Sequence, residues 1–483
     1  MLFNSLDFAI FLPIVFILYW FVVSRNISRQ NSLIIIASYL FYGWWDWRFL
    51  GLIAFSTLVD YGIGITLGKT ETERHRKLLL WSSLCVNLGI LGFFKYYNFF
   101  VENFVSAFSF FGHSISIDAL KIILPVGISF YTFQTLSYTI DVYRRQLEPT
   151  TNFIAFAAFV SFFPQLVAGP IERATHLLPQ FNKARIFDTQ AARDGLRQIL
   201  WGLLKKIVIA DNCAEFANII FNNSDQYTGS TLLLGAFFFT FQIYGDFSGY
   251  SDIAIGTARL FGFDLKQNFA FPYFSRDIAE FWRRWHISLS TWFRDYLYIP
   301  LGGSRGSTAL KVRNTFIIFL VSGFWHGANW TFIVWGGLNA LYFLPLLLSK
   351  RNRNHIEIVA KGNFLPTFRE TLSIILTFGL TVLAWIFFRA ESLSHAFSYL
   401  SDMLSSSLFT IPKLEDPRGA FITIVLITLF MIVEWIGRAE QYGFAFIKYL
   451  PSRLIRYCIY YIVIAVILFF GNFNENEFIY FQF

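Results

Sequence analysis

The chain has 483 residues, of which 55% are hydrophobic and only 14% are charged. Soluble domains carry roughly 25% charged residues, and the mean hydropathy here is +0.51, so the composition excludes an ordinary soluble protein and predicts a polytopic membrane protein. The net charge is +8, but basic residues gather in short loops between apolar runs, as in the cluster from Lys69 to Lys77. That placement indicates membrane topology and argues against a nucleic-acid partner.

Apolar segments long enough for membrane helices recur along the whole chain. Several are short or interrupted, so we expect an all-α protein with about ten to twelve transmembrane helices plus re-entrant or interfacial helices. No polar stretch is long enough for a soluble domain, so residues 1–483 are expected to form a single membrane-embedded domain. The apolar segments are 8–23, 32–45, 49–67, 78–94, 120–140, 152–168, 197–221, 231–256, 312–325, 330–348, 370–388, 420–436 and 454–470.

The region 264–311 is too polar for an ordinary span and too aromatic for an ordinary loop. We expect one helix from about Arg276 to Tyr296, with an aromatic and a polar stripe at helical spacing. Such a helix either lies on the membrane surface or lines a polar cavity within the membrane, and its three tryptophans favour the cavity. The aromatic stripe is Phe281, Trp285, Leu289, Trp292 and Tyr296, and the polar stripe is Arg283, His286, Ser290 and Arg294.

His326 lies between two apolar runs, residues 316–325 and 330–348. An ionisable group at such a depth is a functional hypothesis by default, and imidazole is the side chain that titrates near neutral pH. The small residues 327–328 allow close approach of a ligand or backbone, and Asn329 suits the N-cap of the next helix. Two interpretations stand: a catalytic general base, or a histidine that hydrogen-bonds a neighbouring helix.

His286 allows three interpretations: it lines the route to His326, orients a substrate, or caps a helix packing contact. No carboxylate lies three or four residues from either histidine. The sequence therefore offers no local partner of the kind that orients the imidazole in a catalytic triad.

Asp246 and Asp252 fall within an apolar segment, but six residues separate them, so they do not share a helix face. This spacing disfavours a paired-carboxylate site. We expect each to pair with an arginine or hydroxyl elsewhere, with a role in lining a cavity as the alternative. The chain shows no His/Cys/Asp/Glu spacing typical of a metal site, no phosphate-binding glycine loop and no G-x-S-x-G nucleophile elbow.

Four segments together resemble one known family, the membrane-bound O-acyltransferases, and within it the bacterial branch that contains the alginate O-acetylation membrane subunit. Residues 281–292 (FWRRWHISLSTW), continuing to Gly303, resemble the family signature, and residues 322–330 (SGFWHGANW) resemble its catalytic-histidine motif. Residues 246–252 (DFSGYSD) and the tail 477–483 (EFIYFQF) are also similar to that branch.

The resemblance implies a ring of helices around a central tunnel, with His326 deep inside as the general base and His286 nearer the cytoplasmic mouth. Arg283, Arg284 and Arg294 would suit the phosphates of an acyl donor, although membrane-interface snorkelling explains them equally well. Further candidates for lining the tunnel or contacting substrate are Ser290, Asn329, Trp325, Asp246 and Asp252.

The function implied is O-acetylation of an extracytoplasmic polysaccharide such as alginate by a multi-pass protein of the bacterial inner membrane. The donor would be acetyl-coenzyme A or a carrier-protein thioester, acting as substrate, with no bound cofactor and no metal. A periplasmic or membrane-anchored acetyltransferase would receive the acyl group, and membrane lipid would surround the chain. The alternatives are a glycan or lipid-linked-sugar transporter, and a relative that moves D-alanyl groups onto teichoic acid.

Overall fold

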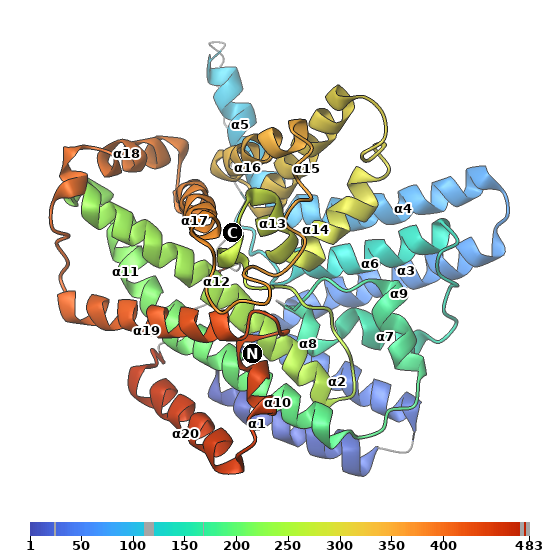
Figure 1. Ribbon diagram of the computed structural model, residues 1–483. Helices are drawn as coiled ribbons and strands as arrows, with labels where there is room; N and C mark the ends of the chain where they lie inside the picture. Colours follow the sequence, from blue (N-terminus) through green and yellow to red (C-terminus); the bar gives the residue numbers. More distant parts are fainter. Residues whose placement is uncertain (24–25, 111–119, 168, 474–477, 480–483) are drawn as a thin grey trace. The chain divides into compact units, whose positions relative to one another are not determined.

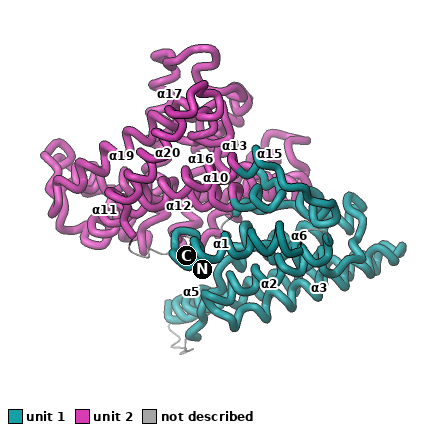
Figure 2. Tube along the Cα trace, turned by 90° about the horizontal axis from the view of Figure 1, so that it is seen from below, with its two compact units in different colours: residues 1–192, 257–266 teal, residues 193–256, 267–483 magenta. Residues whose placement is uncertain are grey.

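The computed structural model describes residues 1–23, 26–110, 120–167, 169–473 and 478–479. Within these ranges every regular element is helical (Figure 1). The chain forms two compact units, one of residues 1–192 and 257–266 and the other of residues 193–256 and 267–483 (Figure 2). The sequence-based expectation of an all-α protein is therefore confirmed over the described residues.

Unit 1 is built mainly from the first nine α-helices, and α10 begins in it. Two π-helical stretches, η1 (Leu18–Val22) and η3 (Gly92–Tyr96), extend α1 and α4. The helices are α1 (Leu6–Ile17), α2 (Ile27–Asp46), α3 (Leu50–Lys69), α4 (Glu73–Leu91), α5 (Tyr97–Phe110), α6 (Ile128–Tyr143), α7 (Phe153–Ser161), α8 (Phe163–Leu166), α9 (Ala174–Leu177) and α10 (Thr189–Leu203), with 3-10 turns η2 (Trp47–Phe49) and η4 (Leu178–Asn182).

A buried carboxylate joins three helices of unit 1. Asp60 on α3 accepts hydrogen bonds from Ser83 and Asn87 on α4, the latter at 2.8 Å, and from Thr139 on α6 at 2.9 Å. All four side chains are buried. Polar side chains that bond between helices stabilise packing where lipid supplies no hydrophobic drive, so this cluster explains why α3, α4 and α6 pack together.

Arg76 belongs to the basic cluster at residues 69–77, but its guanidinium is buried. It donates to the carbonyl oxygens of Leu67 at 2.6 Å and Thr70 at 3.0 Å, beside the end of α3. It also donates to Tyr143 at the end of α6, at 2.8 Å. These are carbonyls left without partners where helices end, so Arg76 acts as a shared cap for α3 and α6.

Unit 2 contains the rest of α10 and most of α12, whose last residues belong to unit 1. Its π-helical stretches are η5 (Leu204–Ala210) and η8 (Arg294–Tyr298). Its other elements are α11 (Asp211–Asn222), η6 (Ser224–Gln226), α12 (Gly229–Leu260), η7 (Pro272–Phe274), α13 (Ile278–Arg284), α14 (Ile287–Phe293), α15 (Thr308–His326), α16 (Trp330–Leu348), α17 (Phe368–Arg389), α18 (Leu393–Met403), η9 (Ser406–Phe409), α19 (Pro417–Ile436), η10 (Gly443–Tyr449) and α20 (Arg453–Phe470).

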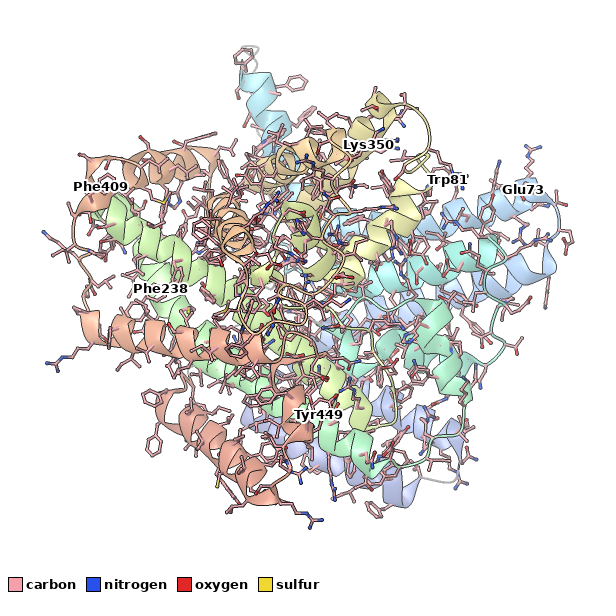
Figure 3. The ribbon with its side chains drawn as sticks, viewed as in Figure 1. Glu73, Trp81, Phe238, Lys350, Phe409 and Tyr449 are labelled. Carbon is pink, nitrogen blue, oxygen red and sulfur yellow. The ribbon has the colours of Figure 1, made fainter. Side chains whose placement is uncertain are left out.

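Apolar side chains lie on the outside as well as in the core. Trp81 on α4 is 62% exposed, whereas Phe238 on α12 is fully buried (Figure 3). By length and composition, six helical stretches of the described chain are long and apolar enough to cross a membrane. They are Ile27–Lys69, Glu73–Phe110, Trp330–Leu348, Phe368–Arg389, Pro417–Ile436 and Arg453–Phe470. A polytopic protein is therefore supported, and the larger number of ten to twelve crossings stays a prediction.

Candidate active site

His326 ends α15 at the tip of a tight helical hairpin with α16 (Figure 1). Asn329 caps α16, because its side-chain oxygen accepts from the Thr331 N–H at 3.0 Å, so the predicted N-cap is confirmed. The helices approach closely at glycines: a Cβ on Gly323 would lie 2.2 Å from the Phe332 carbonyl oxygen. This close packing fixes the backbone that carries His326.

Aromatic rings surround the His326 imidazole, which is only 3% exposed. The ring centroids of Trp325, Trp335 and Phe388 lie 4.9, 5.1 and 5.2 Å from its own, all in edge-on geometry. Trp335 comes from α16 and Phe388 from α17. Rings at these distances leave the imidazole little freedom to rotate, and they exclude water from the sides that they cover.

The single helix expected from Arg276 to Tyr296 is wrong. The backbone breaks at His286, which has the left-handed φ of 44° and separates α13 from α14. Such a φ is uncommon outside glycine and is found at functional sites. The break turns His286 inward to 1% exposure, so the expected polar stripe does not exist as one face.

Asn268 orients His286, a role that local sequence spacing could not reveal. The His286 Nδ1 lies 3.1 Å from Asn268 Oδ1. The Ser288 backbone N–H and hydroxyl donate to the same oxygen, at 3.3 and 2.8 Å. Because a backbone N–H only donates, that atom is an acceptor, and the imidazole Nδ1 therefore carries the proton. The lone pair of neutral His286 is then on Nε2.

Trp325 connects the two histidines. Its ring centroid lies 6.0 Å from that of His286 and 4.9 Å from that of His326. Phe247 on α12 packs edge-on against His286 at 4.6 Å. The structure thus brings both histidines and the predicted candidate Trp325 into one buried aromatic cluster of unit 2.

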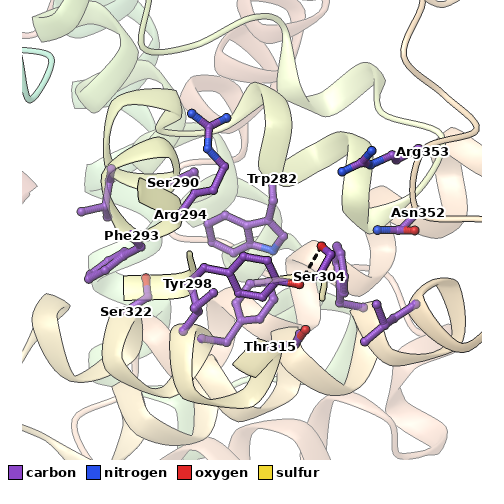
Figure 4. A pocket seen from close by; sticks show the side chains of 15 residues that line it. Trp282, Ser290, Phe293, Arg294, Tyr298, Ser304, Thr315, Ser322, Asn352 and Arg353 are labelled. Atoms are coloured by element: carbon purple, nitrogen blue, oxygen red, sulfur yellow. Dashed lines mark hydrogen bonds between the residues drawn. The ribbon is translucent and has the colours of Figure 1, made fainter. Parts of the chain in front are cut away.

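A pocket of about 250 Å³ opens beside this cluster. Ser322, one helical turn before His326 on α15, lies on its wall, and the predicted candidates Ser290 and Arg294 line it as well. Figure 4 shows Arg294 on one side of the Trp282 indole, with Asn352 and Arg353 on the other. The remaining lining residues are Leu289, Phe293, Tyr298, Ser304, Thr315, Ile318, Phe319, Phe343 and Leu347.

The wall of the pocket leads to His326 through two indoles. The ring of Trp282 lies 5.6 Å from that of Trp335, which contacts His326. Trp282 is held by a hydrogen bond from its Nε1 to the Asn339 side chain at 3.2 Å. The pocket and the histidine therefore share a rigid aromatic wall.

The three predicted arginines have different partners. Arg283 donates to the carbonyl oxygens of Asn352 and His355, both at 2.8 Å. Arg284 forms an ion pair with the buried Glu280 at 2.8 Å. Arg294 pairs with Asp295 at 2.7 Å and lines the pocket.

Asp246 and Asp252 form ion pairs with lysines, whereas the sequence analysis expected an arginine or a hydroxyl as the partner of each. Lys206 lies 2.9 Å from Asp246 and 2.8 Å from Asp211. Lys205 lies 2.9 Å from Asp252 and 3.3 Å from Glu434. Two consecutive lysines inside the apolar segment 197–221 are the sequence signal that could have revealed this cluster.

The end of the chain also reaches this cluster. The Ile479 N–H donates to Asp246 Oδ2 at 2.7 Å, and Phe478 is buried against Phe247 and Tyr250. Of the tail resembling the family, residue 477 and residues 480–483 lie outside the described residues.

Comparison with known proteins identifies the family of the chain. A family model described as the membrane-bound O-acyltransferase family matches residues 144–387. The probable alginate O-acetylase of Azotobacter vinelandii is 41% identical over 445 residues, which cover 92% of this chain and 86% of that protein. The peptidoglycan O-acetyltransferase of Helicobacter pylori is 35% identical, covering 87% and 83%. The teichoic acid D-alanyltransferase of Bacillus subtilis is 27% identical, covering 56% and 70%. The chain thus belongs to the membrane-bound O-acyltransferase family and is a multi-pass membrane O-acyltransferase.

Proposed function

We propose that the protein moves an acetyl group from a thioester donor on the cytoplasmic side of a bacterial inner membrane toward an extracytoplasmic polysaccharide. The observation that carries the proposal is the placement of His326: it is buried among aromatic rings, one helical turn beyond a pocket whose mouth bears arginines. The relatives named as alginate and peptidoglycan O-acetyltransferases favour acetyl as the acyl group.

In the proposed step, the neutral imidazole of His326 accepts the proton of an attacking hydroxyl. The hydroxyl oxygen bonds to the thioester carbonyl carbon and the carbon–sulfur bond breaks. The leaving thiolate takes up the proton that His326 accepted, which returns the imidazole to its neutral form. General-base catalysis of this kind contributes typically 10²–10⁴-fold, or about 3–5 kcal/mol of the barrier. His286, with its Nδ1 proton directed to Asn268, would offer Nε2 as an acceptor along the same route.

The pocket suits the donor better than the acceptor. Its inner wall is largely apolar and its mouth carries Arg294 and Arg353, and guanidinium groups match phosphate oxygens well. A charged donor cannot cross lipid, but its acyl group can pass through a narrow protein route. We therefore include in the proposal a central tunnel and ten to twelve membrane crossings. We also include a periplasmic or membrane-anchored acetyltransferase that completes the transfer.

Thioester consumption tests the proposal directly. Acetyl-coenzyme A with a label in its acetyl group is added to the purified protein. Release of the coenzyme A thiol is then measured with and without the protein. The proposal predicts protein-dependent release of thiol and label. A transporter of glycans would leave the thioester intact, and this result would overturn the proposal.

A D-alanyl-loaded carrier protein serves as the second donor in the same assay. Consumption of this donor alone would assign the chain to the teichoic acid chemistry of its more distant relatives. Neighbouring genes for a polysaccharide synthase or for cell-wall enzymes would then indicate the acceptor.

A further inference from the structure

The loop between α16 and α17 is held in place by arginines from other elements of unit 2. We call residues 350–364 the strap; its first residue, Lys350, is labelled in Figure 3. Arg283 binds two strap carbonyls, those of Asn352 and His355, and Arg276 binds that of Glu357 at 2.5 Å. These charge-assisted bonds fix a segment that has no helix of its own, and long ordered loops of this kind are usually functional.

Arg438 and Trp435 hold the later part of the strap. The Arg438 guanidinium donates to the carbonyl oxygens of Val359 at 3.2 Å and Asn363 at 2.7 Å. The Trp435 Nε1 donates to that of Phe364 at 2.9 Å. These bonds run from side chains of the body to backbone carbonyls of the strap, and they do not engage the side chains of Asn352 and Arg353.

Two of those side chains, Asn352 and Arg353, line the pocket. Arg283 donates a hydrogen bond to the carbonyl oxygen of Asn352, the residue that immediately precedes Arg353. The strap therefore supplies one half of the polar mouth, and Arg294 from η8 supplies the other half (Figure 4). Arg351, two positions before Arg353, is exposed and is not among the lining residues.

The lining predicts the shape of the ligand. Ile318, Phe319 and Leu347 form an apolar wall, whereas the mouth carries two guanidinium groups and an amide. An elongated molecule with an uncharged arm and an anionic end satisfies both parts. Phosphate fits the mouth, because arginine binds phosphate oxygens through paired N–H groups.

We propose that Arg353 and Asn352 bind the phosphate groups of a phosphopantetheine-bearing acyl donor, and that Arg283 is a positioning residue that acts on this donor through the strap. The inference rests on the proposed function, since it requires a thioester donor of this class. It also gives Arg283 a role different from the direct phosphate contact expected from its sequence context.

Calorimetric titration of the purified full-length protein with three probes tests the assignment: coenzyme A, 4′-phosphopantetheine and pantetheine. Arg353→Ala should weaken binding of the two phosphorylated probes about tenfold and that of pantetheine less than about twofold, because only the former carry phosphate. Arg351→Ala is the matched control and should change all three by less than about twofold. An Arg353 effect confined to coenzyme A would overturn the contact with the phosphate that both donor classes share, because coenzyme A alone carries further phosphates.

Arg283→Ala should weaken the same two probes about fivefold, add little to Arg353→Ala in the double variant, and speed amide hydrogen exchange in residues 352–356. Should Arg283→Ala fail to fold, Arg283→Lys replaces it, since an ammonium lacks the planar fork that reaches both carbonyls.

Identical affinities of Arg353→Ala and Arg351→Ala for every probe would overturn the inference while leaving the proposed function standing. Absence of both probe binding and thioester consumption in the wild-type protein would instead overturn the proposed function.

Discussion

Unit 2 buries polar groups in two contrasting ways. Lys205 and Lys206 are surrounded by carboxylates, with four lysine–carboxylate contacts between 2.8 and 3.3 Å. His326 is packed instead by the edges of three aromatic rings. Both centres are almost fully buried, so burial alone does not distinguish them.

The contrast distinguishes buried groups that stabilise the fold from a buried group that takes part in the reaction. An opposite charge beside a titratable group favours its charged form, so a lysine matched by carboxylates is held in one state and ties helices together. A general base has to gain and lose a proton in every cycle. Aromatic rings carry no net charge, so they fix the position of an imidazole without holding a proton on it, which suits the role proposed for His326.

We call Lys205, Lys206 and the carboxylates that pair with them the ionic cluster. Removing a lysine from it should destabilise the fold more than removing an exposed lysine that also forms an ion pair. Lys206→Met leaves Asp211 and Asp246 buried without their shared cation, and breaking a buried pair costs about 3–5 kcal/mol. We expect the melting temperature in detergent to fall strongly, as measured by thermal unfolding.

Lys448→Met is the matched control, because Lys448 pairs with Glu440 at 2.8 Å but is 42% exposed. Its loss should stay below about 1 kcal/mol. Equal stability of the two variants would contradict the structural role of the ionic cluster.

Asn268→Ala should reduce activity rather than mainly stability. The change removes the acceptor for His286 Nδ1, and a buried donor left without its partner costs about 1–3 kcal/mol. Lost in the transition state, that energy lowers kcat about 5–160-fold. Thioester turnover per folded molecule measures this effect.

Asn87→Ala controls for the general cost of losing a buried asparagine, because Asn87 bonds to Asp60 and accepts from Ser56. It should leave turnover per folded molecule within about twofold. If Asn268→Ala does no more than this control, Asn268 does not act through His286.

His176 is a histidine that lies beside carboxylates, so it should behave like the paired lysines and not like His326. The expected effect on stability is smaller. Hydrogen bonds to Asp264 and Glu172 raise the pKa of His176 to about 9. A raised pKa stabilises the fold fully below the unfolded pKa of about 6.5, and this contribution is lost as the pH rises through about 9. We expect a loss on the order of 1–2 kcal/mol, reduced by partial exposure.

Melting temperatures measured from pH 6 to pH 10 check this expectation. His176→Gln should flatten the decline, whereas His75→Gln, at an exposed histidine of unit 1, should preserve it. An unchanged decline in His176→Gln would show that the stability lost at high pH comes from other groups.

Local patterns in the sequence were sufficient for the helical hairpin around His326. Apolar runs on both sides, small residues at positions 327–328 and a capping asparagine are all short-range signals, and the structure has α15, α16 and the Asn329 cap where they were expected. The same kind of reasoning supported the all-helical class.

Long-range contacts and backbone breaks could not be predicted in this way. Helical spacing gave no sign that the chain turns at His286, because a left-handed φ at a histidine depends on bonds such as Ile287 N–H to Asn268 O at 2.9 Å. The partners of Lys205 and of Arg283 lie tens to hundreds of residues away along the chain. Their identity follows only from the folded arrangement.

The most direct test of the account is the O-acetyl content of the envelope polysaccharide in cells that carry His326→Gln in place of the wild-type gene. The account predicts a loss of at least about 100-fold, with normal amounts of folded protein in the membrane, while His395→Gln on α18 leaves acetylation unchanged. Near wild-type acetylation in the His326→Gln cells would contradict the assignment of His326 as the general base.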